Sequence, residues 1–235
     1  MQESKVKKVN KSQDKKSNAS IIKDPEFIRE LIASIIFLAI CTILNSKVAN
    51  PLIDVIFPNR PLNQDLMFKI LPYIGWTQYV TDIAIAIGVV AFVWYLYAEH
   101  LRFLPKYIVA YGWMNLLRGC MILLTPMARP TGNYEPYGFF VNYRQYGMFP
   151  SGHVATLMVF YMLIDGMLYR KLKIAMLVLL FIEIVSLLLS RGHYSIDIVG
   201  GLMVGYFAYK IAFHGNWKEL FVKQGGIIFP SQRSN

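Results

Sequence analysis

The chain has 235 residues, of which 55% are hydrophobic and 16% are charged. Its mean hydropathy of +0.41 is too high for a soluble domain of this size and is typical of a polytopic membrane protein. The formal charge of +10 could indicate nucleic-acid binding, but the basic residues lie at the ends of apolar runs, as membrane topology requires. We therefore expect an all-α membrane protein with no nucleic-acid partner.

The two ends of the chain are polar. Residues 1–26 are rich in lysine and almost free of apolar side chains, so we expect a disordered tail that lies near the negative lipid surface. Residues 27–213 should form one membrane domain, and residues 214–235 should form a second tail.

Apolar runs predict six transmembrane helices in the membrane domain. The runs cover about residues 28–49, 78–98, 107–125, 154–168, 174–189 and 196–213. Asn50-Pro51 should end the first helix, because proline interrupts helical hydrogen bonding, and residues 52–73 should lie along the membrane surface. Cys41 and Cys120 lie in different runs without metal-ligand spacing, so we expect no disulfide and no zinc site.

A polar stretch, residues 190–197, separates the last two apolar runs and contains His193 and Asp197. If a helix starts near Tyr194, these two side chains lie about one turn apart. The carboxylate can then hold one imidazole nitrogen and leave the other facing a substrate. This pattern is half of a nucleophilic site.

A second polar turn, residues 150–153, precedes the fourth apolar run. Ser151 favours a helix N-cap, and a helix that starts there directs its free N–H groups and positive dipole end outward, which suits a phosphate. His153 would lie in the first turn beside that phosphate. One histidine on an apolar helix is usually structural, but two at helix starts on one membrane face indicate a functional site.

Charged residues inside the apolar runs, such as Arg118 and Glu183, are expensive in a bilayer and therefore indicate function. Arg118 could extend to the interface, pair with Glu183, or reach a phosphate from below. Glu183 could be a neutral, hydrogen-bonded carboxyl or a member of an ion pair. Gly200-Gly201 predicts a bend or a close contact between helices.

The distribution of basic residues predicts the topology. If the amino terminus is cytosolic, 17 of the 24 Lys and Arg residues lie on that side and six lie on the other. The positive-inside rule then assigns both termini to the cytosol and both histidine motifs to the exoplasmic or luminal face.

The two motifs resemble those of the type-2 phosphatidic acid phosphatase superfamily, a group of integral-membrane enzymes. Ser-Gly-His at residues 151–153 and His-x-x-x-Asp at residues 193–197 carry the resemblance. Within the superfamily the chain looks most like the sphingomyelin synthase branch. Residues 61–65 are similar to the Pro-Leu-Pro-Asp loop of that branch, and residues 118–130 are similar to its Arg-x-x-x-Met-x-x-Thr…Pro motif.

The resemblance implies six transmembrane helices and a catalytic triad of His153, His193 and Asp197. His193 would attack phosphorus to give a phosphohistidine, with Asp197 orienting it. His153 would protonate the departing oxygen and later activate the acceptor. No metal or other cofactor is implied. The residues that we expect to bind the substrate are Arg118, Arg129, Ser151, Gly152 and Arg191.

The chain departs from both branches. The proline before Ser-Gly-His is the form of the phosphatases, whereas the synthases have Cys-Gly-Asp ahead of that motif. Arg129-Pro130 also matches the phosphatases, but Ile122 stands where their lysine would be. Arg191 lies two residues before His193. The phosphatases, in contrast, have Ser-Arg five residues before their histidine.

Two enzymatic functions follow from these features. The first is transfer of a phospho-head group from a membrane phospholipid to a lipid alcohol, such as ceramide or diacylglycerol. The missing lysine favours transfer, because a monoanionic phosphodiester needs less positive charge than a dianionic monoester. The alternative is hydrolysis of a lipid phosphate or diphosphate, favoured by Pro-Ser-Gly-His, Arg129 and Arg191. A transporter or scaffold would be indicated by inverted repeats or broken helices, and the sequence has neither. The oligomeric state stays open.

Overall fold

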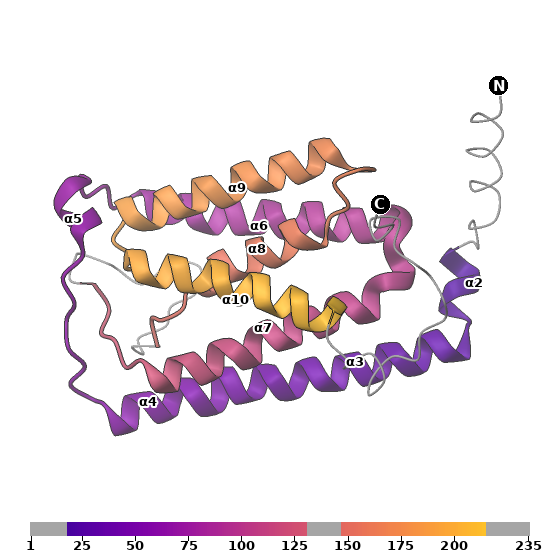
Figure 1. Cartoon of the computed structure of the whole chain (residues 1–235), viewed down its shortest axis with the longest axis horizontal. Coiled ribbons are helices and arrows are strands. Elements are labelled where there is room, and N and C mark those ends of the chain that lie inside the picture. Colours follow the sequence, from indigo (N-terminus) through magenta and orange to yellow (C-terminus); the bar gives the residue numbers. More distant parts are fainter. Residues whose placement is uncertain (1–17, 131–146, 215–235) are drawn as a thin grey trace.

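The computed structural model describes residues 18–130 and 147–214, and this part of the chain folds into helices without a β-strand (Figure 1). Five helices are long and apolar enough to cross a membrane. They are Pro25–Ile56, Thr77–Ala98, Leu101–Leu124, Arg170–Leu189 and Ser195–Phe213. The protein is therefore an all-α, multi-pass membrane protein, as the composition predicted.

The expected fourth transmembrane helix is shorter than predicted. Helix α8, Gly152–Leu163, has 12 residues and is about 18 Å long, whereas the hydrocarbon core of a bilayer is about 30 Å thick. The predicted end at Leu168 is wrong because Asp165 starts a turn in which its Oδ1 accepts the N–H of Met167 at 2.7 Å. α8 packs against α6, α7, α9 and α10, and most of its residues are buried. It is a central helix, and six spans are not confirmed.

The first transmembrane helix is longer than predicted. Helix α3, Pro25–Ile43, passes through a π-helical turn, η1, Leu44–Ala49, into helix α4, Asn50–Ile56. The predicted end at Asn50-Pro51 is wrong, because Pro51 occupies the first turn of α4, where its missing N–H is tolerated. Short helix α5, Leu66–Ile70, follows in the segment that we expected along the membrane surface.

The amino-terminal segment is partly helical. Helix α2, Asn18–Ile22, lies within the 26 residues that we expected to be disordered. The Asp24 side chain then caps α3 by accepting the N–H of Glu26 at 3.0 Å. The prediction for residues 1–17 lies outside the described residues, as does that for residues 215–235.

The remaining helices form the bundle around α8. Their bounds are Thr77–Tyr95 for α6, Leu96–His100 for the π-helical η2, Leu101–Phe103 for the 3₁₀-helical η3, Leu104–Leu124 for α7, Arg170–Leu189 for α9 and Ser195–His214 for α10. α3 packs against α7, α6 against α9, and α10 against both α7 and α8. Fully buried Val154, Leu157 and Met176 belong to the main apolar core.

Three glycines of α10 allow α8 and the segment before it to approach closely. A Cβ atom at Gly201 would lie 2.8 Å from the carbonyl oxygen of Ser151, and one at Gly205 would lie 2.8 Å from that of Ala155. A Cβ at Gly200 would lie 2.6 Å from the ring of Phe149. The close contact predicted from Gly200-Gly201 is therefore confirmed.

All the predicted functional motifs lie near one end of the bundle (Figure 1). This end contains the starts of α8 and α10, the carboxyl ends of α7 and α9, and α5. Helix α2 and the end of α10 lie at the opposite end. The alternating direction of the helices thus gathers the two motifs, which are about 40 residues apart in sequence.

Candidate active site

His193 and Asp197 lie one turn apart at the start of α10, as their spacing predicted. His193 Nδ1 is 3.1 Å from Asp197 Oδ2, and the same oxygen accepts the N–H of Tyr194 at 3.0 Å. The Asp197 side chain is 0% exposed. Its Oδ1 is buried and has no hydrogen-bond partner among the described residues. Because Nδ1 donates to the carboxylate, Nε2 is the nitrogen left for another group.

Ser151 joins the two motifs through its backbone. Its N–H donates to the carbonyl oxygen of Asp197 at 3.0 Å, so the start of α8 is fixed against the start of α10. Ser151 occupies the N-cap position of α8, but its side chain makes no capping hydrogen bond. The expected side-chain cap is therefore wrong. Ser151 Oγ is instead fully buried and unpartnered within the described part of the chain.

The start of α8 is an open helix terminus. The N–H groups of Gly152, His153 and Val154 have no acceptor within the helix, because the first turn has no preceding carbonyls. These donors and the helix dipole create a positive potential there. His153 lies within electrostatic range of both His193 and Arg118. The start of α8 therefore has the donors and the potential to bind an anion.

Arg118 reaches this turn from α7. Its Nε donates to the carbonyl oxygen of Pro150 at 3.0 Å, and its Nη1 donates to Asn45 Oδ1 at 3.4 Å. A Cβ atom at Gly152 would lie 3.2 Å from Arg118 Nε, so only glycine leaves the guanidinium this position without displacement. Arg118 thus lies beside the turn that precedes α8, and its role in binding a phosphate stays a prediction.

Glu183 does not pair with Arg118. Its side chain is fully buried, and neither carboxyl oxygen has a hydrogen-bond partner in residues 18–130 and 147–214. The charged group within electrostatic range of Glu183 is another carboxylate, Asp82 of α6. Within these ranges Glu183 therefore makes neither the expected hydrogen bond nor the expected ion pair.

Arg191 has a different partner from Arg118. Its φ of 52° is in the left-handed region that glycine usually occupies. There it ends α9, with its N–H bonded to Leu188 O and that of the next residue bonded to Leu187 O. Its Nη2 donates to Phe68 O at 3.3 Å, and its guanidinium lies over the rings of Phe68 and Tyr73. The charge of Arg191 thus anchors α5.

Arg129 is partly buried in the segment that follows α7. This segment passes the linker between α4 and α5, since Ala128 N–H donates to Pro61 O at 3.3 Å. The structure does not bring Arg129 into a described contact with His153, His193 or Asp197.

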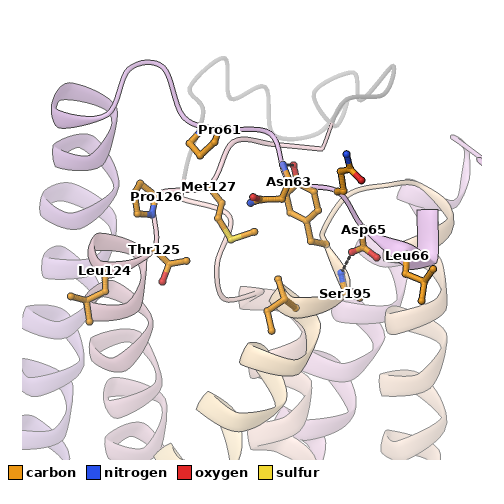
Figure 2. Close-up of a pocket in the computed structure, with 12 residues that line it drawn as sticks. Pro61, Asn63, Asp65, Leu66, Leu124, Thr125, Pro126, Met127 and Ser195 are labelled. Atoms are coloured by element: carbon orange, nitrogen blue, oxygen red, sulfur yellow. Dashed lines mark hydrogen bonds between the residues drawn. The ribbon is translucent and has the colours of Figure 1, made fainter. Parts of the chain in front are cut away.

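Asp65 has a structural role that the sequence did not reveal. Its Oδ1 accepts the N–H of Met67 at 2.8 Å, which caps α5, and its Oδ2 accepts the N–H of Ser195 at the start of α10 (Figure 2). The N–H of Asn63 also donates to the hydroxyl of Tyr194 at 3.3 Å. An aspartate just before a helix is a known capping signal, but its second partner is 130 residues away.

A cavity of about 590 Å³ adjoins the His193 motif (Figure 2). Its lining consists of Pro61, Asn63, Gln64, Asp65, Leu66, Leu124, Thr125, Pro126, Met127, Tyr194, Ser195 and Ile196. Amide, hydroxyl and aliphatic groups, the carboxylate of Asp65 and the thioether of Met127 therefore surround it. The lining includes Tyr194, the residue after His193, but neither histidine of the two motifs.

Residues 148–214 match the family model described as PAP2 superfamily C-terminal. The matched segment contains both motifs together with α8, α9 and α10. This match supports the type-2 phosphatidic acid phosphatase superfamily and an enzyme of the lipid phosphatase or phosphotransferase type. No curated protein matches the chain.

Metal ligands are not grouped in the described ranges, where no set of three or more His, Cys, Asp or Glu residues could hold an ion. Cys41 and Cys120 are both free thiols. The expectation that the reaction needs no metal stays a prediction.

Proposed function

We propose that this protein transfers a phospho-head group from a membrane phospholipid to a lipid alcohol, such as ceramide or diacylglycerol, through a phosphohistidine. The observation that carries the proposal is the hydrogen bond from Ser151 N–H to Asp197 O. It fixes the open start of α8 beside the His193–Asp197 pair. A nucleophile and an anion-binding helix terminus thus share one site.

In the first half of the reaction, His193 Nε2 attacks phosphorus. A P–N bond forms as the bond from phosphorus to the glycerol oxygen of the donor breaks. Asp197 holds the Nδ1–H and stabilises the positive charge that develops on the ring. His153 donates a proton to the departing oxygen, which leaves as an alcohol.

In the second half, His153 takes the proton from the hydroxyl of the acceptor lipid. That oxygen attacks phosphorus, the P–N bond breaks, and His193 is regenerated. Since His153 returns to its protonated form, protons balance over the cycle without another cofactor.

Three groups of donors would bind the phosphate. The free N–H groups of the first turn of α8 point outward, Ser151 Oγ lacks a partner among the described residues, and Arg118 supplies a guanidinium. Preorganised donors of this kind stabilise the charge on the equatorial oxygens as the reaction proceeds.

The environment of Ile122 favours transfer over hydrolysis. This residue replaces the lysine of the phosphatases, and it is fully buried in an apolar cluster with Ala49 and Ile53. One positive charge that would assist a dianionic monoester is therefore absent, whereas a monoanionic diester needs less charge. The cavity lined by Asn63, Thr125 and Tyr194 would receive the polar part of a lipid substrate.

We assign the site to the exoplasmic or luminal face and both termini to the cytosol. Arg102 and Lys106 precede or begin α7, and Arg170 begins α9, so these charges lie at the opposite end from the motifs (Figure 1). Asn18 begins the glycosylation sequon Asn-Ala-Ser. Glycosylation of Asn18 in a eukaryotic host would show that the amino terminus is luminal and would contradict this topology.

The deciding experiment uses detergent-purified protein and four labelled donors: phosphatidylcholine, phosphatidylethanolamine, phosphatidylinositol and phosphatidic acid. Each is incubated with and without ceramide or diacylglycerol, and the products are separated by chromatography. Label on the added acceptor supports transfer. A water-soluble labelled product that forms without an acceptor supports hydrolysis, and no product from any donor overturns both.

A further inference from the structure

A connected set of polar side chains lies between the first transmembrane helix and α7. Asn45 Nδ2 donates to Asn115 Oδ1 at 3.1 Å, while Asn45 Oδ1 accepts Arg118 Nη1 and Asn50 Nδ2, each at 3.4 Å. Asn115 Nδ2 in turn donates to Tyr111 O at 3.0 Å. The three asparagines are 4–8% exposed. Buried amides among apolar helices are costly unless they are hydrogen-bonded, so this arrangement is specific.

The π-helical turn, Leu44–Ala49, creates this set. In an α-helix, residues five apart point about 140° away from each other. The π-helical turn brings Asn45 and Asn50 onto one face, with Asn50 N–H bonded to Asn45 O and Asn50 Nδ2 donating to the same oxygen at 2.8 Å. Gly119 of α7 lets the backbone of α7 approach that of the π-helical turn, since a Cβ at Gly119 would lie 3.2 Å from Asn45 Cα.

The hydrogen bonds of these polar side chains extend to residues 147–150, the segment that precedes Ser151. Asn50 Oδ1 accepts the N–H of Gly147 at 3.0 Å, and Arg118 Nε donates to the carbonyl oxygen of Pro150 at 3.0 Å. Both ends of residues 147–150 are thus held from the first helix and α7. This segment leads directly into the open start of α8, where the proposed phosphate site lies.

We propose that Asn45 and Asn50 are positioning residues for Arg118 and for the Ser151–His153 turn. Asn45 holds Nη1 of the guanidinium, whose Nε is bonded to Pro150 O, so the two contacts together fix its direction. Asn50 fixes Asn45 and the start of the 147–150 segment. The inference rests on the proposed function, since the group that is positioned acts on the phosphate of the substrate.

A purely structural role makes a different prediction. If the asparagines only join helices, their loss lowers stability and reduces activity by the same factor whatever residue stands at position 118. If Asn45 acts through Arg118, its loss has no further effect once the guanidinium is gone. A double-mutant cycle separates the two.

The experiment measures kcat/KM and the melting temperature in detergent, using the donor lipid that the wild type consumes, for Asn45→Ala, Arg118→Ala and the double variant. Ser46→Ala is the matched control, because Ser46 lies in the same π-helical turn, is exposed, and its hydroxyl donates to Thr42 O within its own helix. Stabilisation by orthovanadate, a phosphate analogue, gives a second readout that needs no turnover.

We expect Asn45→Ala to lower kcat/KM and vanadate affinity roughly tenfold and Arg118→Ala to lower kcat/KM roughly a hundredfold. The double variant should match Arg118→Ala, and the Ser46→Ala control should match the wild type. If Asn45→Ala does not fold, the same cycle with Asn45→Ser, which also removes Oδ1 but keeps a small polar side chain, decides.

Two outcomes would overturn this inference alone, provided that the wild type is active. The first is that Asn45→Ala lowers kcat/KM by the same factor in the wild-type and Arg118→Ala backgrounds, and the second is that it lowers kcat/KM of the wild type by less than about twofold. A wild type that neither consumes a phospholipid nor responds to vanadate would overturn the proposed function and the inference with it.

Discussion

The two helix starts that meet in the candidate site differ in how their backbone N–H groups are satisfied. At α10, Asp65 Oδ2 accepts the N–H of Ser195, and Asp197 Oδ2 accepts that of Tyr194. At α8, the side chain of Ser151 makes no capping hydrogen bond. One start is therefore closed by two carboxylates, and the other is open.

This difference separates two tasks. The closed start of α10 uses its carboxylates to fix the backbone and the His193 ring, and their negative charge disfavours an anion there. The open start of α8 keeps its N–H donors and positive dipole end for a ligand, with Arg118 beside it. In the proposed reaction, His193 held at one start would meet a phosphate bound at the other.

The largest effect should come from removing the nucleophile at the closed start. His193→Ala should abolish formation of the labelled phosphoenzyme, and Asp197→Asn should slow it by roughly 10⁴-fold, because the carboxylate sets the tautomer of the ring. Rapid quenching with head-group-labelled donor measures both. Label trapped on a protein that lacks His193 would show that another residue is the nucleophile.

His153 should have a smaller effect that depends on the substrate. As a general acid it assists an alkoxide, so His153→Ala should lower the rate roughly 10²-fold to 10⁴-fold with a lipid donor. The loss should be much smaller with a nitrophenyl phosphate ester, whose leaving group needs no proton. Comparing kcat for both substrates in His153→Ala and the wild type tests this. Equal losses on the two substrates would contradict the role of a general acid.

Crowding the open start should cause an intermediate loss. Gly152→Ala adds a Cβ 3.2 Å from Arg118 Nε and displaces the guanidinium, so we expect roughly a tenfold lower kcat/KM with little change in melting temperature. Gly166→Ala is the control, since its Cβ would lie 3.1 Å from Lys173 Cδ, far along a flexible side chain. Similar losses in both variants would mean that general crowding, and not Arg118, is responsible.

Local patterns in the sequence predicted both helix starts. The spacing of His193 and Asp197 and the order of Ser151, Gly152 and His153 are properties of one turn of helix, so they can be inferred without tertiary contacts. Apolar runs likewise predicted six transmembrane helices, and five of them correspond to helices that are long and apolar enough to cross a membrane. The glycine pair in α10 correctly indicated close packing, because only a missing side chain permits it.

Contacts between distant segments could not be predicted in this way. The backbone N–H of Ser151 donates to Asp197 O, and that acceptor comes from another helix. The π-helical turn at Asn45 overrides the stop signal of Asn50-Pro51, because the asparagine contacts with α7 stabilise it. At Asn50-Pro51, tertiary hydrogen bonds therefore outweigh a local preference.

The smallest expected effects come from one variant at each helix start, Asp65→Ala at the closed start of α10 and Ser151→Ala at the open start of α8. Asp65→Ala removes the acceptor for two backbone N–H groups, so we expect a loss of roughly 1–2 kcal/mol of stability. Ser151→Ala removes a hydroxyl that caps nothing, so its stability should change by less than about 0.5 kcal/mol. Its affinity for orthovanadate should nevertheless fall several-fold, because the anion loses one donor.

Melting curves in detergent, with and without orthovanadate, measure both quantities for the two variants. Asp65→Ala should melt earlier yet keep its vanadate-induced shift, since Asp65 contacts the backbone of α5 and α10 and not that of α8. A Ser151→Ala protein that melts as early as Asp65→Ala would show that Ser151 is a true cap. An unchanged vanadate shift in Ser151→Ala would mean that its hydroxyl does not face the anion, and the open start of α8 would then bind phosphate through N–H groups and Arg118 alone.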